Sequence, residues 1–289
     1  MEFESRLKAY ADTVNSRLNE LLPPEAQRPA ELHRAMRYSC LAPGKRLRPA
    51  LCLACCEAVG GSTEAALDAA CAIEMVHCFS LIHDDLPSLD DDDLRRGLPT
   101  CHIQFGEAMA ILAGDALLTL AFNALANSKG NATNVLLALR ELTQATGSDG
   151  LAGGEALDVQ SEGQAVDPET VDFIHRHKTG ALIAAACTVG GILGGGSREE
   201  VEGFRAYGLN LGLAFQITDD LLNETAAQAT LGKSAGSDRN RQKATFPALF
   251  GLDHSRRLAD QASTDAIQSL PVGSPLLEWL AQFAVTRQS

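Results

Sequence analysis

The segment SLIHDDLPSLDDDDLRRG occupies residues 80–97 and is the most informative stretch of the chain. Six of its residues are aspartates, and they fall within the ten positions 84–93. An acidic run is most often a solvated surface, but this one ends an apolar helical pattern and is followed at once by Arg95 and Arg96. Carboxylates suit Mg²⁺, which is usually held by one or two carboxylates and phosphate oxygens, whereas the spacing of an EF-hand is absent. The segment therefore predicts a metal and phosphate site.

A second acidic cluster, DDLLN at residues 219–223, closes another apolar helical pattern, which spans 207–222. Asp219 and Asn223 are four residues apart and would share one helix face. One acidic pair at a helix end is common, but two clusters that each close an apolar helix form a stronger pattern. Neighbouring helices could direct both clusters into one cavity, with metal ions between them.

Helical signals extend from both clusters over most of the chain. Ala and Leu are abundant, β-branched runs are scarce, and pairs such as Pro23-Pro24 and Gly60-Gly61 mark turns. The sequence shows no strand–helix alternation and no repeat of solenoid period. We expect one all-α domain over residues 1–289. The expected helices cover 2–22, 30–42, a segment ending at Val59, 63–86 with Thr63 as N-cap, 106–127, 131–146, 148–161, a segment from Pro168 through 181–193, 197–224, and the residues from Phe246 onward, with a loop over 226–240.

The charge balance argues against one class of partner. Lys and Arg number 24 against 37 Asp and Glu, for a net charge of −13, whereas a general nucleic-acid binder should be basic. Residues 1–10 do not resemble a signal peptide, and we expect no membrane span, because no apolar run is long and uninterrupted enough. The eight cysteines lie mostly in apolar surroundings, which predicts buried thiols and a reducing, cytoplasmic location.

Basic residues gather in short groups outside the acidic clusters. Each alone is more often a solvated surface residue, but two diphosphates with their metal ions would need a distributed set of Lys and Arg. The groups are Lys45, Arg46 and Arg48; Arg95 and Arg96; His175, Arg176, His177 and Lys178; Lys233; and Lys243.

Together these features closely resemble the trans-polyprenyl diphosphate synthases, especially the bacterial farnesyl diphosphate synthases. The resemblance runs from about residue 30 to the end, with the motifs in order. The family fold is the isoprenoid-synthase-type bundle of antiparallel helices around a deep central cavity, which agrees with the all-α expectation. The motifs are GKRLRP (44–49), the segment 80–97, AGDAL (113–117), HKTG (177–180), FQITDD (215–220), LGK (231–233) and KATFP (243–247).

The resemblance implies roles for individual residues, and it also implies a homodimer. The ligands of three Mg²⁺ ions would be Asp84 and Asp90, with Asp85 assisting, and Asp219, with Asp220 nearby. The residues that hold the allylic diphosphate would be Arg95, Lys178 and Lys233. The residues that hold isopentenyl diphosphate would be Lys45, Arg48, His77 and Arg96. The cavity where positive charge develops would be lined by Thr179 and Gln216.

The spacing of the first motif sets a geometric requirement. Six steps of about 100° would place Asp84 and Asp90 on different faces of a straight α-helix. The helix must therefore bend or break between them if both carboxylates bind one diphosphate. Pro87 supplies the reason for the break, because proline cannot continue a helix.

The implied reaction is ionisation, condensation and elimination. Metal ions and cations stabilise the departing diphosphate, and the double bond of isopentenyl diphosphate attacks the allylic carbocation. A proton is then lost to the bound pyrophosphate. No side-chain nucleophile is needed, which fits the lack of a Ser-His or Cys-His signature.

The length of the product depends on the residues before Asp84. Phe79 lies about 7.5 Å before it along the helix axis, at about 1.5 Å per residue, and its ring can form a floor under the growing chain. An aromatic residue here, with Leu86-Pro87 inserted in the motif, resembles the fifteen-carbon farnesyl synthases. Small Ser80 beside it keeps geranylgeranyl diphosphate as the alternative product.

Two positions depart from the family pattern, and three other functions compete. Asn223 replaces a third aspartate, which predicts weaker binding of the third metal, and Glu155 replaces a glutamine with no evident consequence. A class I terpene cyclase would need Ser or Thr and then Glu at fixed steps after the second motif, and Asn223 and Ala227 do not fit. A catalytically silent regulatory homologue should have lost an acidic motif. An acidic calcium-binding module is a more distant alternative.

Overall fold

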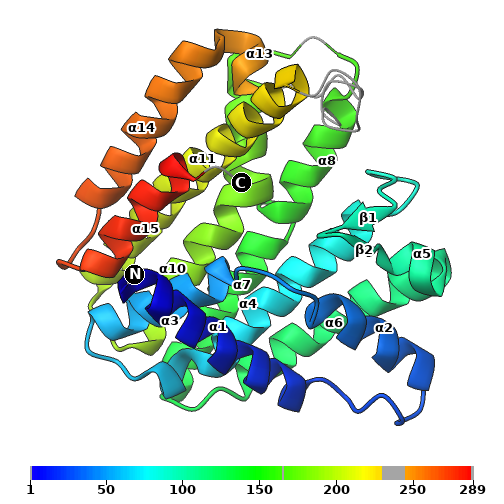
Figure 1. Ribbon diagram of the computed structural model, residues 1–289. Coiled ribbons are helices and arrows are strands. Elements are labelled where there is room, and N and C mark those ends of the chain that lie inside the picture. Colours follow the sequence, from blue (N-terminus) through cyan, green and yellow to red (C-terminus); the bar gives the residue numbers. More distant parts are fainter. Residues whose placement is uncertain (1, 165, 230–244, 288–289) are drawn as a thin grey trace.

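The computed structural model describes residues 2–164, 166–229 and 245–287, and this part of the chain is a bundle of helices with one small two-stranded ladder (Figure 1). This architecture confirms the all-α prediction. The elements in chain order are α1 (Glu2–Leu21), α2 (Ala30–Cys40), α3 (Leu47–Ala58), α4 (Thr63–Asp84), β1 (Leu94–Arg95), β2 (Leu98–Pro99), α5 (Cys101–Phe105), α6 (Glu107–Ala126), α7 (Ala132–Thr146), α8 (Leu151–Ser161), α9 (Pro168–Ile174), the π-helix η1 (His175–Gly180), α10 (Ala181–Leu193), α11 (Arg198–Ala229), α13 (Phe246–Phe250), α14 (Leu252–Gln268) and α15 (Pro275–Thr286).

Some helices begin at a residue whose side chain caps them. Asn131 and Asp167 each accept a hydrogen bond from a backbone N–H of the first turn that follows, which satisfies one of the amide groups left without a partner there. The N-cap of α4 is Ser62, whose hydroxyl accepts from the N–H of Ala65 at 3.4 Å. The expected cap, Thr63, is instead the first helical residue, because Ser62 already has the extended backbone that a cap needs.

Two helices, α4 and α10, form the middle of the bundle. Their side chains are apolar almost all round, a pattern typical of a helix enclosed by other helices. α4 packs against α3, α6 and α10, and α10 packs against α3, α7 and α11. Toward the C-terminus, α11, α14 and α15 lie side by side, and α11 packs against α10 (Figure 1). The first acidic cluster therefore begins at the end of a core helix, whereas the second lies within α11, which continues beyond the expected end to Ala229.

The structure differs from the expectation about membrane spans. By length and composition alone, α4 and α6 could each cross a bilayer. Burial in the protein core explains why α4 is so apolar, because 67% of its most apolar 18-residue stretch is buried. In α6, only 39% of the corresponding stretch is buried. The exposed face of α6 carries Ile111 and Leu112. Packing in the core does not account for the apolar residues on this face.

Two local features near the acidic clusters were not expected. Residues Leu94–Arg95 and Leu98–Pro99 pair as an antiparallel ladder whose turn contains Arg96 and Gly97, both with positive φ. The helix that was expected to run unbroken from Pro168 widens into the π-helix His175–Gly180. Such wide turns appear often at functional sites, and this one contains the HKTG motif.

Candidate active site

A cavity of about 890 Å³ opens between α1, α3, α4, α11 and α15. Its wall brings together residues that are far apart in the sequence and that were expected to bind substrate, to bind metal or to line the region where positive charge develops. They are Lys45, Arg48, His77, Arg95, Arg96, Thr179, Gln216 and Asp219. The lining also includes apolar residues, among them Leu211, Phe215, Trp279 and Phe283, but neither Phe79 nor Ser80.

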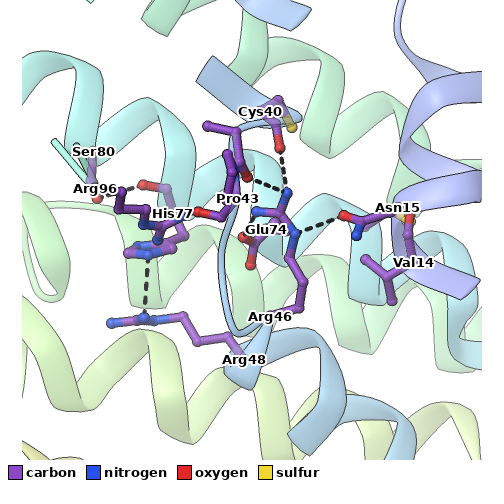
Figure 2. A network of polar contacts seen from close by, with 12 residues as sticks. Val14, Asn15, Cys40, Pro43, Arg46, Arg48, Glu74, His77, Ser80 and Arg96 are labelled. Carbon is purple, nitrogen blue, oxygen red and sulfur yellow. Dashed lines mark hydrogen bonds and ion pairs between the residues drawn. The ribbon is translucent and has the colours of Figure 1, made fainter. Parts of the chain in front are cut away.

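Arg46 fixes the loop that carries the cations Lys45 and Arg48. It is 3% exposed, has a left-handed backbone at φ 49°, and precedes α3 directly. Its guanidinium donates to the carboxylate of Glu74 at 2.7 Å, to two carbonyls at the end of α2 and to the Asn15 side chain (Figure 2). The sequence grouped Arg46 with the site cations, but its charge is already neutralised inside the protein. Arg46 therefore holds the loop in place.

Arg48 has a buried guanidinium group whose surroundings favour the binding of an anion. Its Nη1 lies 3.5 Å from Nε2 of His77 (Figure 2), and its buried Nε has no hydrogen-bond partner among the described residues. Burial lowers the pKa of Arg48, against the attraction of Glu74 and Asp219. Burial and then the nearby Arg48 also lower the pKa of His77 well below its ordinary value, which keeps the imidazole neutral. A bound anion would satisfy the open donor of Arg48.

Arg96 reaches the same loop from the β-ladder. Its Nη1 donates to the carbonyl of Pro43 at 2.9 Å (Figure 2). The side chain thus crosses from the end of the first acidic segment to the residues just before Lys45. This contact brings together the four residues assigned to isopentenyl diphosphate.

The first acidic cluster shows the break that its spacing required. α4 ends at Asp84, and the chain folds back so that the N–H of Asp90 donates to the carbonyl of Asp84 at 2.7 Å. Pro87 lies in this turn. The prediction of a break between the two aspartates is confirmed, and it places Asp90 beside the end of the helix.

Asp84 and Asp85 have different surroundings. Burial, followed by repulsion from Glu155 and Asp90, raises the pKa of Asp84 to about 7 against the opposing attraction of Lys178. Repulsion of this kind marks a place where a divalent cation would be stabilised. Asp85 is buried and accepts from Nε of Arg95 at 2.6 Å. In this structure Arg95 is thus tied to the acidic segment itself.

Lys178 is held by two carboxylates of α8. Its Nζ lies 2.7 Å from Glu155 and 2.7 Å from Asp158. Burial works against the charge of Lys178, but these two acids and Asp84 outweigh it and raise the pKa. Asp158 was not identified from the sequence, because a single acid on an amphipathic helix carries no motif of its own.

The second acidic cluster also divides its two aspartates between different tasks. Asp219 lines the cavity and accepts from Nη2 of Arg287 at 2.6 Å. Asp220 is buried, accepts from the N–H of Phe246 at 3.2 Å and lies 3.4 Å from Nε2 of His175. Asp219 can therefore face a ligand, while Asp220 joins α11 to α13 and η1.

Thr179 and Gln216 lie where the π-helix meets α11. The Thr179 hydroxyl donates to the Gln216 carbonyl oxygen at 2.8 Å, and the Gln216 amide donates to Asp220 at 3.1 Å. These bonds orient two polar oxygens in the cavity wall. Arg287 was missed by the sequence analysis, because a lone arginine that follows the last helix gives no motif signal. Its guanidinium lies over the ring of Phe215, 3.7 Å from the centroid.

The carboxylate oxygens of the two clusters suit Mg²⁺ whose remaining ligands are phosphate and water. They do not suit a metal ion whose ligands all come from the protein. In the described ranges, no three His, Cys, Asp or Glu side chains converge tightly enough to hold an ion by themselves. Mg²⁺ usually takes one or two carboxylates and completes its shell with water and phosphate. Asp84, Asp90 and Asp219 offer such incomplete sets of oxygen ligands. Lys233 and Lys243 lie outside the described residues.

Phe79 and Ser80 take different faces of α4. Phe79 is half-buried and its ring meets the His83 ring edge-on at 4.9 Å. Ser80 is buried, and its hydroxyl donates to the carbonyl of His77. At about 100° per residue, Ser80 lies about 40° and Phe79 about 140° around the helix from Asp84. Of the two, Ser80 lies closer to the face that carries the first metal ligand.

Comparisons with known proteins agree on one family. Residues 29–270 match the polyprenyl synthetase family. The chain is 47% identical over 272 residues to the heterodimeric geranylgeranyl pyrophosphate synthase large subunit 2 of Arabidopsis thaliana, covering 93% of this chain and 72% of that protein. The structure resembles the geranylgeranyl pyrophosphate synthetase of Pyrococcus horikoshii, with a TM-score of 0.90, 34% identity and coverage of 99% and 98% of the two chains. It also resembles an FPP/GFPP synthase from Zymomonas mobilis, with a TM-score of 0.86, 36% identity and coverage of 98% and 97%.

Proposed function

The chain belongs to the polyprenyl synthetase family and is a prenyl diphosphate synthase, and we propose that it condenses isopentenyl diphosphate with allylic diphosphates to make geranylgeranyl diphosphate. The observation that carries the substrate class is Arg48. Its Nε has no partner among the described residues, and it lies in the wall of the cavity that Asp219 also lines. An arginine with an unsatisfied hydrogen-bond donor can bind a diphosphate, and carboxylates in the same site can bind the metal ions that accompany the diphosphate.

In the proposed mechanism, the two substrates bind at opposite ends of one polar site. Lys45, Arg48, His77 and Arg96 hold the diphosphate of the isopentenyl substrate. Asp84, Asp90 and Asp219 would hold Mg²⁺, which supplies positive charge for the departing allylic diphosphate. Arg95, Lys178 and Lys233 complete the allylic diphosphate site.

The bound substrates then react in three steps: ionisation, condensation and elimination. The C1–O bond of the allylic substrate breaks, and the carbocation is stabilised by the oxygens of Thr179 and Gln216. The terminal double bond of isopentenyl diphosphate attacks it, so a new C–C bond forms, and a proton leaves to the released pyrophosphate. No group on the chain is altered, and the site resets when both products leave.

The proposed twenty-carbon product rests on two observations. The Arabidopsis relative and the Pyrococcus structure are both named geranylgeranyl pyrophosphate synthases. The small residue Ser80, and not the ring of Phe79, lies closer to the Asp84 face of α4, so that face carries less bulk against a growing chain. Farnesyl diphosphate is the second candidate. The aromatic Phe79 favours it, as the resemblance to bacterial farnesyl synthases does.

The product decides between these candidates. The purified protein should be incubated with Mg²⁺, dimethylallyl diphosphate and radiolabelled isopentenyl diphosphate, and the dephosphorylated products separated by chain length. We expect the twenty-carbon alcohol as the main product and no product in excess EDTA. A product that stops at fifteen carbons would establish the farnesyl alternative. A cyclic hydrocarbon or no product would favour a cyclase or a silent homologue.

We also infer a homodimer that works in the cytoplasm. The half-exposed apolar face of α6, with Ile111 and Leu112, is a surface that a second copy would cover. All eight cysteines are buried free thiols, which suits a reducing compartment. A membrane surface is the alternative partner for the apolar face of α6. The oligomeric state of the protein in solution distinguishes a membrane surface from a second copy.

A further inference from the structure

Glu155 is the departure from the family pattern that the sequence left unexplained, and in the structure its carboxylate lies 2.7 Å from the ammonium of Lys178 and repels the carboxylate of Asp84. It lies on α8 next to Gly154, whose Cα is so close to η1 that a Cβ there would come within 2.2 Å of the Lys178 backbone nitrogen. The absence of a side chain at Gly154 thus lets α8 pack tightly on η1. The carboxylates of Glu155 and Asp158 both reach the ammonium of Lys178 as a result.

Among the described contacts of Lys178, carboxylates outnumber its single ammonium group. One ammonium meets two carboxylates at 2.7 Å, and both acids are largely buried, with 16% and 11% of their side chains exposed. Asp84 also interacts with Lys178 and with Glu155. A neutral amide at position 155 would remove one of the two carboxylates in contact with Lys178, so Glu155 adds a negative charge that also acts on Asp84.

We propose that Glu155 is a positioning residue that raises the affinity of the Asp84 site for a divalent cation and holds Lys178 back from a metal-free diphosphate. The proposal rests on the assignment of Asp84 as a metal ligand. An added negative charge attracts Mg²⁺ in a half-buried site. The same charge competes with a phosphate anion for Lys178, so a diphosphate without its metal binds weakly. Glu155 therefore couples diphosphate binding to prior metal binding.

The test measures binding without turnover. Mn²⁺, whose free form is visible by electron paramagnetic resonance, would be titrated into the substrate-free protein and into Glu155→Gln. Because one unit of charge close to the ion is lost, we expect the Mn²⁺ dissociation constant of Glu155→Gln to rise on the order of tenfold. In calorimetry without metal, inorganic pyrophosphate should bind this variant more tightly than the parent.

Two variants control for other effects. Glu162→Gln removes the same charge from an exposed position just past the same helix, about 10 Å along the axis, and should leave both constants unchanged. Glu155→Asp keeps the charge and should stay within about twofold of the parent. The proposal is overturned if Glu155→Gln binds Mn²⁺ as tightly as the parent, or if Glu155→Asp loses as much affinity. Because no substrate is used, these results stand whether or not the protein makes geranylgeranyl diphosphate.

Discussion

At the level of single residues, the two aspartates of each pair are divided between different partners. Asp219 lines the cavity and accepts from Arg287, and Asp84 lies at the end of α4 beside Asp90, whereas Asp85 accepts from Arg95 and Asp220 accepts from the N–H of Phe246. A sequence motif shows the pair but not the division. The division comes from contacts between helices that are distant along the chain.

Arg48 should matter for substrate binding more than for the chemical step. A charged hydrogen bond contributes about 1.5–3 kcal/mol, so Arg48→Gln should raise KM for isopentenyl diphosphate about 10–150-fold with a smaller change in kcat. Steady-state kinetics with isopentenyl diphosphate as the varied substrate measures this. Arg34→Gln is the matched control, because Arg34 is an exposed residue paired only with Glu31 among the described residues. An unchanged KM in Arg48→Gln would remove Arg48 from the substrate site.

At the level of elements, helix packing explains the glycine of the AGDAL motif at residues 113–117. A Cβ on Gly114 of α6 would lie 2.3 Å from Nε2 of His83 on α4. The glycine therefore lets His83 lie between the helices, where its Nε2 is 3.1 Å from the carbonyl of Ile111. The motif therefore supports the helix that carries Asp84.

Gly114→Ala should consequently weaken this packing. Forcing a methyl group into a filled interior costs about 1–3 kcal/mol, and the free energy of unfolding from a denaturant titration should fall by that amount. Gly273→Ala is the control, because a Cβ at Gly273 meets nothing within 4 Å. Equal stability of the two variants would show that α4 and α6 can separate without cost.

Product length should respond to Ser80. Ser80→Phe places a ring on the Asp84 side of α4 and should shorten the main product to fifteen carbons, while Phe79→Ala should leave it at twenty or longer. Chromatography of the dephosphorylated products, with a thermal melt to confirm folding, measures both. If Phe79→Ala lengthens a fifteen-carbon parent product and Ser80→Phe has no effect, Phe79 is the floor of the cavity.

For the whole molecule, local pattern predicted the helices well and tertiary contacts poorly. Hydrophobic periodicity and turn residues are local, so the bundle and the break after Asp84 could be inferred from the chain. The π-helix at Lys178 and the ladder at Arg95 are set by packing, which leaves no periodic signal. Arg287 and Asp158 reach the site through ion pairs between distant segments. Arg46 looked like a site cation because the sequence does not reveal Glu74 beside it.

The apolar face of α6 predicts the oligomeric state. A second copy that buries Leu112 would give a particle of twice the 30.6 kDa of one chain. Leu112→Glu should place a charge in that interface and yield monomers at micromolar concentration. Size-exclusion chromatography with light scattering measures both masses. A monomeric parent would mean that something other than a second copy, such as a membrane surface, covers α6.

The most direct test is the stoichiometry of pyrophosphate release. Released pyrophosphate and consumed isopentenyl diphosphate would be measured together, with dimethylallyl diphosphate and Mg²⁺ present, for the parent and for Asp84→Ala and Asp219→Ala. We expect one pyrophosphate for each isopentenyl diphosphate consumed. Each folded variant should be slower on the order of a thousandfold, because charge stabilisation of the leaving group is lost. Pyrophosphate release without consumption of isopentenyl diphosphate, or near-normal rates in either variant, would contradict a prenyl transfer organised by the two aspartate clusters.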